Sequence, residues 1–270
     1  MPRRKTDPPR GVLNSALAAE QRIVHARYHP SADLEPWVEH FWAVRWDMRG
    51  LPSHRVETLP HPSVHLVFED GKGGQVSGIT KGKFTRLLSG LGGVFAAKFR
   101  PGGFYPFVRT PVAGFADTTL SPGRVWERDG EALEKDVSLQ TDDDGRMAVI
   151  EEFLRARRPQ PDEHAALSGR VVETIAADRE LRTMDEVARR FSLNARTLQR
   201  MFARYIGVNP KWVIQRYRLH EAAEQLAQGT ASQSALALEL GYTDQAHFIN
   251  DFKAIVGVSP AAYARRARSA

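Results

Sequence analysis

The strongest constraint on the fold of this chain is an internal repeat with a spacing of fifty residues in its C-terminal part. Both copies place a helix-capping residue, large apolar residues and a Gly-x-x-Pro exit at matched positions. The corresponding positions are Val187–Ala188 and Ala237–Leu238, Asn194 and Asp244, Leu198 and Phe248, Phe202 and Phe252, and 206–210 and 256–260. Such a match indicates two copies of one supersecondary unit.

Each copy is typical of a short helix, a tight turn and a longer helix. In the first copy, Thr183-Met-Asp-Glu186 forms a capping box, which opens a helix running to about Arg190. In the second copy, Gly241 is suited to end one helix as its left-handed C′ residue, and Asp244 starts the next. The pattern predicts helix-turn-helix units at about 183–206 and 232–256.

The longer helix of the first copy carries the side chains that best fit base recognition. Its apolar positions Leu198, Met201, Phe202 and Tyr205 recur on one helical face. The opposite side carries Arg196, Gln199 and Arg200, and Arg pairs with guanine and Gln with adenine in the major groove. A solvated amphipathic helix is the simpler interpretation of one such pattern, but the repeat favours recognition.

A long helix predicted over 211–228 separates the two units. Its eighteen residues, at about 1.5 Å each, span about 27 Å. That length suits two recognition helices in successive major grooves, about 34 Å apart on one face of DNA. A single chain could therefore read two segments.

The basic charge of the chain is concentrated around the repeat. The net charge is +6, and from Ala165 onward there are 15 Lys/Arg against 10 Asp/Glu. Between Arg189 and Arg218 there are eight basic residues and no Asp or Glu, as a phosphate-binding surface requires. We predict phosphate contacts from Arg189, Arg190, Arg204, Lys211 and Arg216.

Residues from about Ser168 to Arg266 resemble the DNA-binding domain of AraC/XylS-family transcriptional regulators. The resemblance rests on Leu198-Gln-Arg-Met-Phe202, Gly207-Val-Asn-Pro210, Gly241-Tyr242, His247-Phe248, Phe252-Lys253 and Gly257-Val-Ser-Pro-x-x-Tyr263. It implies a seven-helix domain with two helix-turn-helix units. By position, the base-reading residues would be Arg196, Gln199 and Arg200, with Gln245, His247 and Asn250 in the second unit.

The second unit departs from the family pattern in its charge. Many members carry Arg where Asn250 stands and an uncharged residue where Asp251 stands. The helix here carries Asp244 and Asp251 and the single base Lys253. We therefore expect the first unit to supply most of the affinity for DNA.

The N-terminal part has the alternating pattern and turn chemistry of short β-strands. Trp42, Val44 and Trp46 alternate along one strand, and Val64–Phe68 forms another. Gly- and Pro-containing turns separate these runs and predict a small β-barrel or sandwich. Two helices are expected to follow, at 122–136 and 146–157.

This part also resembles the sensor half of a poorly characterised subgroup of the AraC/XylS family. The resemblance rests on Leu59-Pro-His-Pro-Ser63, the strand Val64–Phe68 and Phe99-Arg-Pro-Gly-Gly103. It implies a cupin-like β-domain, so the fold class is α+β multidomain with an all-α C-terminal domain. We predict a flexible basic tail over 1–21, a β-rich sensor or dimerisation domain over 22–157, a linker over 158–167 and the DNA-binding domain over 168–270.

Three further groups of residues allow either a functional or a purely structural interpretation. Arg100, Phe104, Tyr105 and Trp42 could form an effector pocket with a cation for a carboxylate or phosphate. The alternative, which we favour, is an Arg paired with an acid and aromatic rings in the core. His61, His65 and Glu57 could bind a metal, but strand residues four apart span about 13 Å, so no metal is predicted. Asp142–Asp144 are better explained as charges at a helix N-terminus.

The expected function is sequence-specific transcriptional regulation through double-stranded DNA. There is no Cys, which excludes thiolate chemistry, and we see no paired nucleophile and base, so we expect neither an enzyme nor a cofactor. A small-molecule effector, a homodimer and RNA polymerase are possible partners, whereas no membrane contact and a cytoplasmic location are expected. The alternatives are an N-terminal half that only dimerises, or a metal-dependent enzyme fused to the DNA-binding domain.

Overall fold

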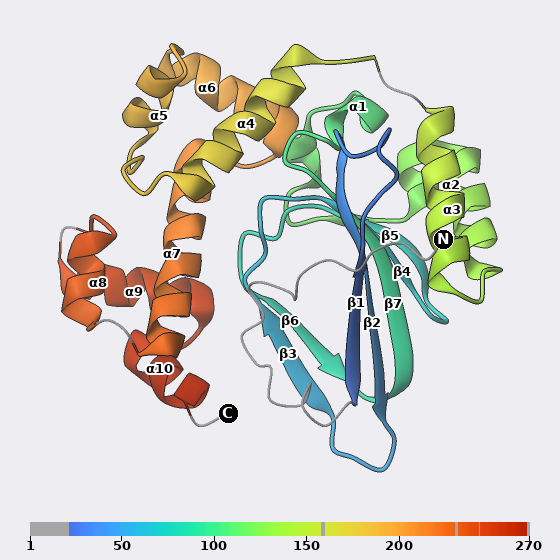
Figure 1. Cartoon of the computed structure of the whole chain (residues 1–270), viewed down its shortest axis with the longest axis horizontal. Coiled ribbons are helices and arrows are strands. Elements are labelled where there is room, and N and C mark those ends of the chain that lie inside the picture. The colour runs from blue at the N-terminus through green and yellow to red at the C-terminus, as the bar shows by residue number, and fades with distance from the viewer. Residues whose placement is uncertain (1–21, 158–159, 230–231, 243, 269–270) are drawn as a thin grey trace.

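The computed structural model describes residues 22–157, 160–229, 232–242 and 244–268. Its N-terminal part is built on a six-stranded antiparallel sheet with the strand order β1-β2-β7-β4-β5-β8 (Figure 1). These strands are β1 (Ile23–Tyr28), β2 (Val38–Met48), β4 (His65–Glu69), β5 (Gly73–Ser77), β7 (Gly90–Phe99) and β8 (Thr119–Leu120). A separate two-stranded ribbon pairs β3 (His54–Thr58) with β6 (Phe84–Leu88).

One face of the six-stranded sheet packs against helices. Its alternate residues Phe41, Leu66, Phe95 and Ala97 are fully buried in the main core, because successive side chains of a strand point to opposite faces. The covering helices are α2 (Pro122–Ser138), which is broken at Trp126–Glu127, and α3 (Asp143–Ala156). Both predicted helices are thus present.

The opposite face of the sheet is covered in part by the β3–β6 ribbon. Trp46, Met48, Val94 and Leu88 form a smaller apolar cluster there. The predicted β-rich domain with two helices is confirmed. The barrel, however, is not closed, because β1 and β8 are the two edges of the main sheet and do not pair with each other. Short α1 (Tyr105–Val108) and the 3-10 turn η2 (Val112–Phe115) follow β7.

The C-terminal part consists of helices, as predicted. Seven α-helices and one π-helical turn occur between residues 163 and 268, within the described residues. They are α4 (Glu163–Ala177), α5 (Met184–Arg190), α6 (Ala195–Met201), η3 (Phe202–Ile206), α7 (Pro210–Gln228), α8 (Gln233–Glu239), α9 (Gln245–Val256) and α10 (Pro260–Arg268). The stretch 163–167, which we predicted as linker, is helical because the Asp162 side chain caps α4. The predicted tail over 1–21 lies outside the described residues.

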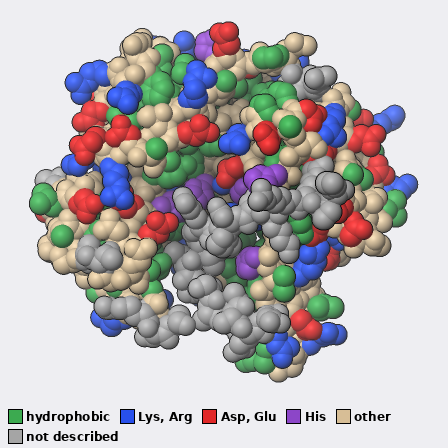
Figure 2. Space-filling model, viewed as in Figure 1, with side chains coloured by type: hydrophobic (Ala, Val, Ile, Leu, Met, Phe, Trp, Pro, Cys, Tyr) green, Lys and Arg blue, Asp and Glu red, His purple; other side chains and the backbone are tan. Residues whose placement is uncertain are grey.

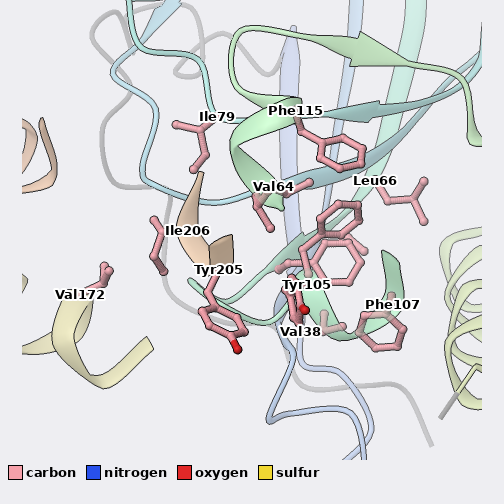
Figure 3. Packing of buried hydrophobic residues seen from close by; sticks show 14 of the residues in the cluster. Val38, Val64, Leu66, Ile79, Tyr105, Phe107, Phe115, Val172, Tyr205 and Ile206 are labelled. Atoms are coloured by element: carbon pink, nitrogen blue, oxygen red, sulfur yellow. The ribbon is translucent and has the colours of Figure 1, made fainter. Parts of the chain in front are cut away.

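A single apolar core joins the two parts of the chain. Tyr205 and Ile206 of η3 and Val172 of α4 belong to the same cluster as Tyr105 and Val38 of the N-terminal part (Figure 3). The rings of Tyr105 and Tyr205 meet edge to face at 4.5 Å. The contact places the first helix-turn-helix unit directly against the N-terminal part.

At this contact the backbone at Gly207 also lies close to the backbone of η2 in the N-terminal part. Gly207 has φ +101°, and a Cβ atom there would lie 2.9 Å from the carbonyl oxygen of Val112. Only glycine adopts this conformation readily and leaves room for that carbonyl. Gly257, its counterpart in the repeat, also has positive φ, so the two Gly-x-x-Pro exits share one backbone geometry.

Candidate nucleic-acid interface

The first helix-turn-helix unit is formed by α5 and α6 and is fixed by its caps. The capping box is present, since the Thr183 hydroxyl accepts from the Glu186 backbone and the Glu186 carboxylate accepts from the Thr183 backbone at 2.8 Å. The turn ends α5 with Ser192 in the left-handed region, and the Leu193 amide donates to the Ala188 carbonyl. Asn194 then caps α6 by accepting from the Thr197 amide at 2.8 Å. Local sequence predicted the two N-caps, Thr183 and Asn194, but not the left-handed Ser192.

Replacing Thr183 with alanine is expected to lower the free energy of unfolding by about 1 kcal/mol, because an orphan amide at the start of α5 loses its acceptor. Urea denaturation of the full chain measures the change. Asp185→Ala is the matched control, since Asp185 is exposed in the same turn. An equal loss in both variants would show that the cap bond itself contributes nothing.

The three predicted base-reading residues of the first unit share one exposed face. Arg196, Gln199 and Arg200 on α6 are exposed, whereas Leu198 and Met201 are buried beneath them. The Gln199 amide lies 3.4 Å from the Met184 sulfur of α5. Arg196 and Arg200 take part in no hydrogen bond or ion pair among those found in the described part of the chain, so their guanidinium groups are available for base edges.

The second unit is formed by α8 and α9 and resembles the first with one difference in length. Asp244 caps α9 by accepting from the His247 amide at 2.7 Å, and Gly241 has the expected positive φ. The Tyr242 amide donates to the Ala237 carbonyl, which matches the bond from Leu193 to Ala188. The first helices therefore correspond at a spacing of 49 residues and the recognition helices at 50, because the second turn is one residue longer.

This longer turn corrects one pairing made from the sequence. Val187 and Ala188 correspond to the buried pair Leu236 and Ala237 rather than to Ala237 and Leu238. Leu238 is 77% exposed. A fixed fifty-residue offset could not reveal a single inserted residue in a turn.

The second recognition helix presents a weaker polar face. Gln245, His247 and Asn250 are exposed on α9. Asp251 accepts a hydrogen bond from Gln215 of α7, and its carboxylate lies 3.7 Å from the His247 imidazole. This carboxylate thus stabilises the packing of α9 on α7, which gives a structural reason for an acidic residue on a helix expected to approach DNA.

The five predicted phosphate contacts separate into two groups. Arg189, Arg190 and Lys211 are exposed, as a phosphate contact requires. Arg204 instead donates through Nε to the Tyr105 hydroxyl at 2.8 Å, and its guanidinium lies 5.1 Å from the centre of the Tyr105 ring. In this arrangement Arg204 binds the N-terminal part.

Arg216 contradicts the prediction most clearly, since it is only 1% exposed. It lies on α7 against the loop between β5 and β6, where its Nη2 donates to the carbonyl oxygens of Lys81 and Gly82. The Trp212 ring stacks on it at 4.6 Å. The prediction rested on the density of basic residues around the repeat, whereas the contact between the two parts of the chain buries Arg216.

The predicted effector pocket is not assembled. Phe104 and Tyr105 lie in the main core, whereas Trp42 packs on the other face of the sheet and donates to His65 at 3.2 Å. Arg100 donates to the Glu35 carbonyl at 2.7 Å and lies 3.7 Å from Glu173 of α4. The aromatic residues near the Pro-Gly-Gly turn therefore fill the core, and Arg100 connects the N-terminal part to α4.

Three of the acidic residues considered for metal binding, Asp142, Asp143 and Glu57, have structural partners. Asp142 caps α3, and Asp143 accepts from Tyr28 at 2.7 Å and pairs with Arg45. Glu57 pairs with Lys83 at 2.7 Å. Among the described residues no group of three or more His, Cys, Asp or Glu side chains is placed to hold a metal ion. Within those residues, no helix has both the length and the apolar character needed to cross a bilayer.

Two protein-family models match the chain, one within the β-rich N-terminal part and one within the helical C-terminal part. Residues 187–266 match a helix-turn-helix domain family, which covers α5 to α10. Residues 26–121 match a domain of unknown function, DUF6597, which covers most of the sheet and the ribbon.

Several curated relatives match the C-terminal part. One is an uncharacterised HTH-type transcriptional regulator of Bacillus subtilis, YtdP, with 32% identity over 32% of this chain and 11% of its own length. Another is the HTH-type transcriptional activator RhaS of Escherichia coli, with 37% identity over 28% of this chain and 27% of its own. The matches thus span about a tenth to a quarter of these relatives.

A solved structure matches the same region. The C-terminal domain of AraT, a response regulator from Geobacillus stearothermophilus, is 28% identical and aligns with 36% of this chain and 82% of its own, with a TM-score of 0.33.

Proposed function

We propose that this chain, whose C-terminal domain is an AraC-type helix-turn-helix domain, regulates transcription by binding specific DNA sequences through α6 and α9. The observation that carries the proposal is the exposed Arg196, Gln199 and Arg200 face of α6, in a helix-turn-helix unit whose caps and turn are complete. The curated relatives that match this region are transcriptional regulators, which favours regulation over an enzymatic activity.

In this proposal α6 supplies most of the base recognition and α9 supplies less. The face of α6 carries two cations and an amide, whereas α9 carries Gln245, His247 and Asn250 beside a carboxylate. Arg189, Arg190 and Lys211 would position the domain on the phosphate backbone. The N-terminal part would sense a small molecule or mediate dimerisation. Its packing against the first helix-turn-helix unit would let a change in the N-terminal part alter the position of α6.

Arg200→Ala is expected to weaken binding to the selected DNA site by about 1–3 kcal/mol and to relax sequence choice at one base pair. The reason is the loss of one guanidinium from the face of α6. Selection from a random DNA pool at fixed salt, followed by binding titrations, measures both effects. If Arg200→Ala instead weakened binding to all sequences equally, Arg200 would be a phosphate contact.

Arg189 and Arg204 should differ in the salt dependence of DNA binding. Arg189→Ala is expected to reduce the slope of log K against log salt by about 1, because each phosphate contact releases about one counterion. Arg204→Ala should leave the slope unchanged, because Arg204 binds Tyr105. A reduced slope in Arg204→Ala would mean that the two parts of the chain separate on DNA.

A further inference from the structure

The two helix-turn-helix units bury their apolar residues in separate cores. The buried residues of α5 and α6, such as Val187 and Leu198, belong to the main core that includes the N-terminal part. Those of α8 and α9, such as Leu236 and Phe248, belong to a second cluster that shares no residue with the first. Within the described residues, no buried apolar cluster therefore joins one unit directly to the other.

Helix α7 is the element that contributes to both cores. Its residues Val213 and Ile214 lie in the main core, whereas Leu219, Ala222 and Leu226 lie in the second cluster. Figure 1 shows α5 and α6 toward one end of α7 and α8 and α9 toward the other. A long helix can curve along its length, so a connection through α7 alone would let the angle between the two recognition helices vary. A second connection is needed to hold that angle.

Arg179 makes such a second connection. It lies in the loop between α4 and α5 (178–183), where its Nη2 is 2.9 Å from a carboxylate oxygen of Glu221 on α7 and its Nη1 is 3.4 Å from one of Glu239 on α8. Gln225 of α7 donates to Glu221 at 3.2 Å and to Glu239 at 3.5 Å. Figure 2 shows acidic and basic side chains interspersed on the surface formed by α4, α5 and α7. The four side chains link the loop that precedes the first unit to the first helix of the second.

Arg179 also separates two acidic groups that would otherwise repel each other. Its single positive charge is shared between the carboxylates of Glu221 and Glu239. The Glu221 side chain is only 19% exposed, so water and salt screen it incompletely. Without the guanidinium, two carboxylates on α7 and α8 would face each other with only the Gln225 amide between them. The approach of α8 to α7 at this point therefore depends on the charge of Arg179.

The same loop also contacts the turn of the second unit. A Cβ atom at Gly241 would lie 3.0 Å from the Cδ atom of Arg182, so the Arg182 side chain lies against the turn between α8 and α9. The Arg182 amide donates to Glu186 of α5 at 2.8 Å, which fixes this residue to the start of the first unit. Arg179 and Arg182 thus meet the second unit at the end of α8 and at the turn after it.

We propose that Arg179 and Arg182 are positioning residues that hold the second helix-turn-helix unit at a fixed angle to the first, so that the chain prefers one spacing between the two DNA segments that it reads. Neither residue needs to contact DNA for this role. The length of α7 sets the distance between the units, and the two arginines set the angle. This role rests on the proposed function, because it concerns how the recognition helices α6 and α9 are arranged for DNA.

The first test measures the arrangement of the units without DNA. The chain has no Cys, so Asp185→Cys on α5 and Leu238→Cys on α8, both at exposed positions, can carry two spin labels in the full chain. Double electron–electron resonance then gives the distribution of distances between the labels. We expect a narrow distribution in the labelled parent. Arg179→Ala combined with Arg182→Ala should make it at least about twice as wide, because units without this restraint populate more than one arrangement.

Two further variants serve as controls for the label distances. Arg179→Lys keeps a positive charge beside the two carboxylates and should keep the distribution narrow. Arg170→Ala should also keep it narrow, since Arg170 is exposed on α4 and makes no ion pair found in the described part of the chain. If the double variant fails to fold, Arg179→Ala replaces it, because the Arg179 side chain is 66% exposed and exposed ion pairs contribute little to folding. A distribution as narrow as that of the parent, or equal widening in Arg170→Ala, would overturn the proposal.

The second test uses the DNA that the parent chain selects from a random pool. One base pair inserted between the two selected motifs moves them apart by about 3.4 Å and rotates them by about 35°. The parent and Arg170→Ala should bind this duplex at least about tenfold more weakly than the original, because both units cannot then engage together. The double variant should bind it at most about threefold more weakly, since its units can adjust. An equal penalty in parent and double variant would contradict the proposed role.

Together the two tests distinguish failure of this role from failure of the proposed function. Specific DNA binding with label distances and a spacing preference that Arg179 and Arg182 do not affect would refute the positioning role and leave the regulator proposal intact. Selection of a single motif would do the same. A distribution that widens in the double variant of a chain that selects no DNA sequence would support the fixed angle and refute the regulator proposal.

Discussion

Phe202→Ala is expected to lower the free energy of unfolding by about 3–5 kcal/mol, enough to unfold a large share of a marginally stable chain. Phe202 is fully buried at the start of η3. It lies in the core cluster that contains residues of both the N-terminal sheet and the first helix-turn-helix unit. Removing the ring would leave a cavity that this tightly connected core cannot fill.

Urea denaturation, followed both by tryptophan fluorescence and by circular dichroism, measures this loss. Phe84→Ala is the matched control, because Phe84 is 43% exposed on β6 and should change stability by less than about 1 kcal/mol. Coincident transitions from the two probes would indicate that both parts unfold together. A loss below about 1 kcal/mol in Phe202→Ala would contradict the packing described for this residue.

The second large expected effect is a loss of folding stability at acidic pH. Burial lowers the pKa of His65 to about 3 and of His220 to about 4 from an ordinary 6.5, and the pKa of His61 falls furthest, to about 2. The unfolded chain therefore binds more protons than the folded chain below pH 6.5. The stability contributed by neutral histidines is fully present above that pH and is lost as pH falls toward 4.

For His220 alone, the loss between pH 7 and pH 5 is about 2 kcal/mol, and the three histidines together should destabilise the chain by several times that. Urea denaturation at the two pH values tests this. His220→Gln should reduce the pH dependence, whereas His29→Gln should not, because His29 is exposed on the surface. Equal stability of the parent chain at pH 5 and pH 7 would show that these histidines are hydrated.

The features that the sequence predicted correctly, such as the helix caps, depend on interactions between residues close together in the chain. Thr183, Asn194 and Asp244 cap their helices as expected, because a cap bond spans only three residues. The exposed face of α6 followed from helical periodicity in the same way. The roles of these residues in DNA binding stay predictions.

The features that sequence reasoning missed depend on contacts between distant segments. Arg216 is separated by 135 residues from Lys81, whose carbonyl it binds, and Arg204 by 99 residues from Tyr105. Nothing in the sequence neighbourhood of Arg204 distinguishes it from an exposed arginine. A hint was available for Arg216, because the pattern Trp212-x-x-x-Arg216-x-x-x-His220 places three amphipathic side chains on one face of a long helix.

The shared core has a consequence for how such proteins can be recombined. Tyr205, Ile206 and Gly207 pack closely against the N-terminal part, where they meet Tyr105 and Val112. The apolar side of the first helix-turn-helix unit is therefore buried only when this N-terminal part is present. A chimera that joined this DNA-binding half to a foreign sensor would expose that apolar seam to water. Recombination of the two domains during evolution would therefore require the contact residues on both sides to be exchanged together, although the two domains match separate sequence families.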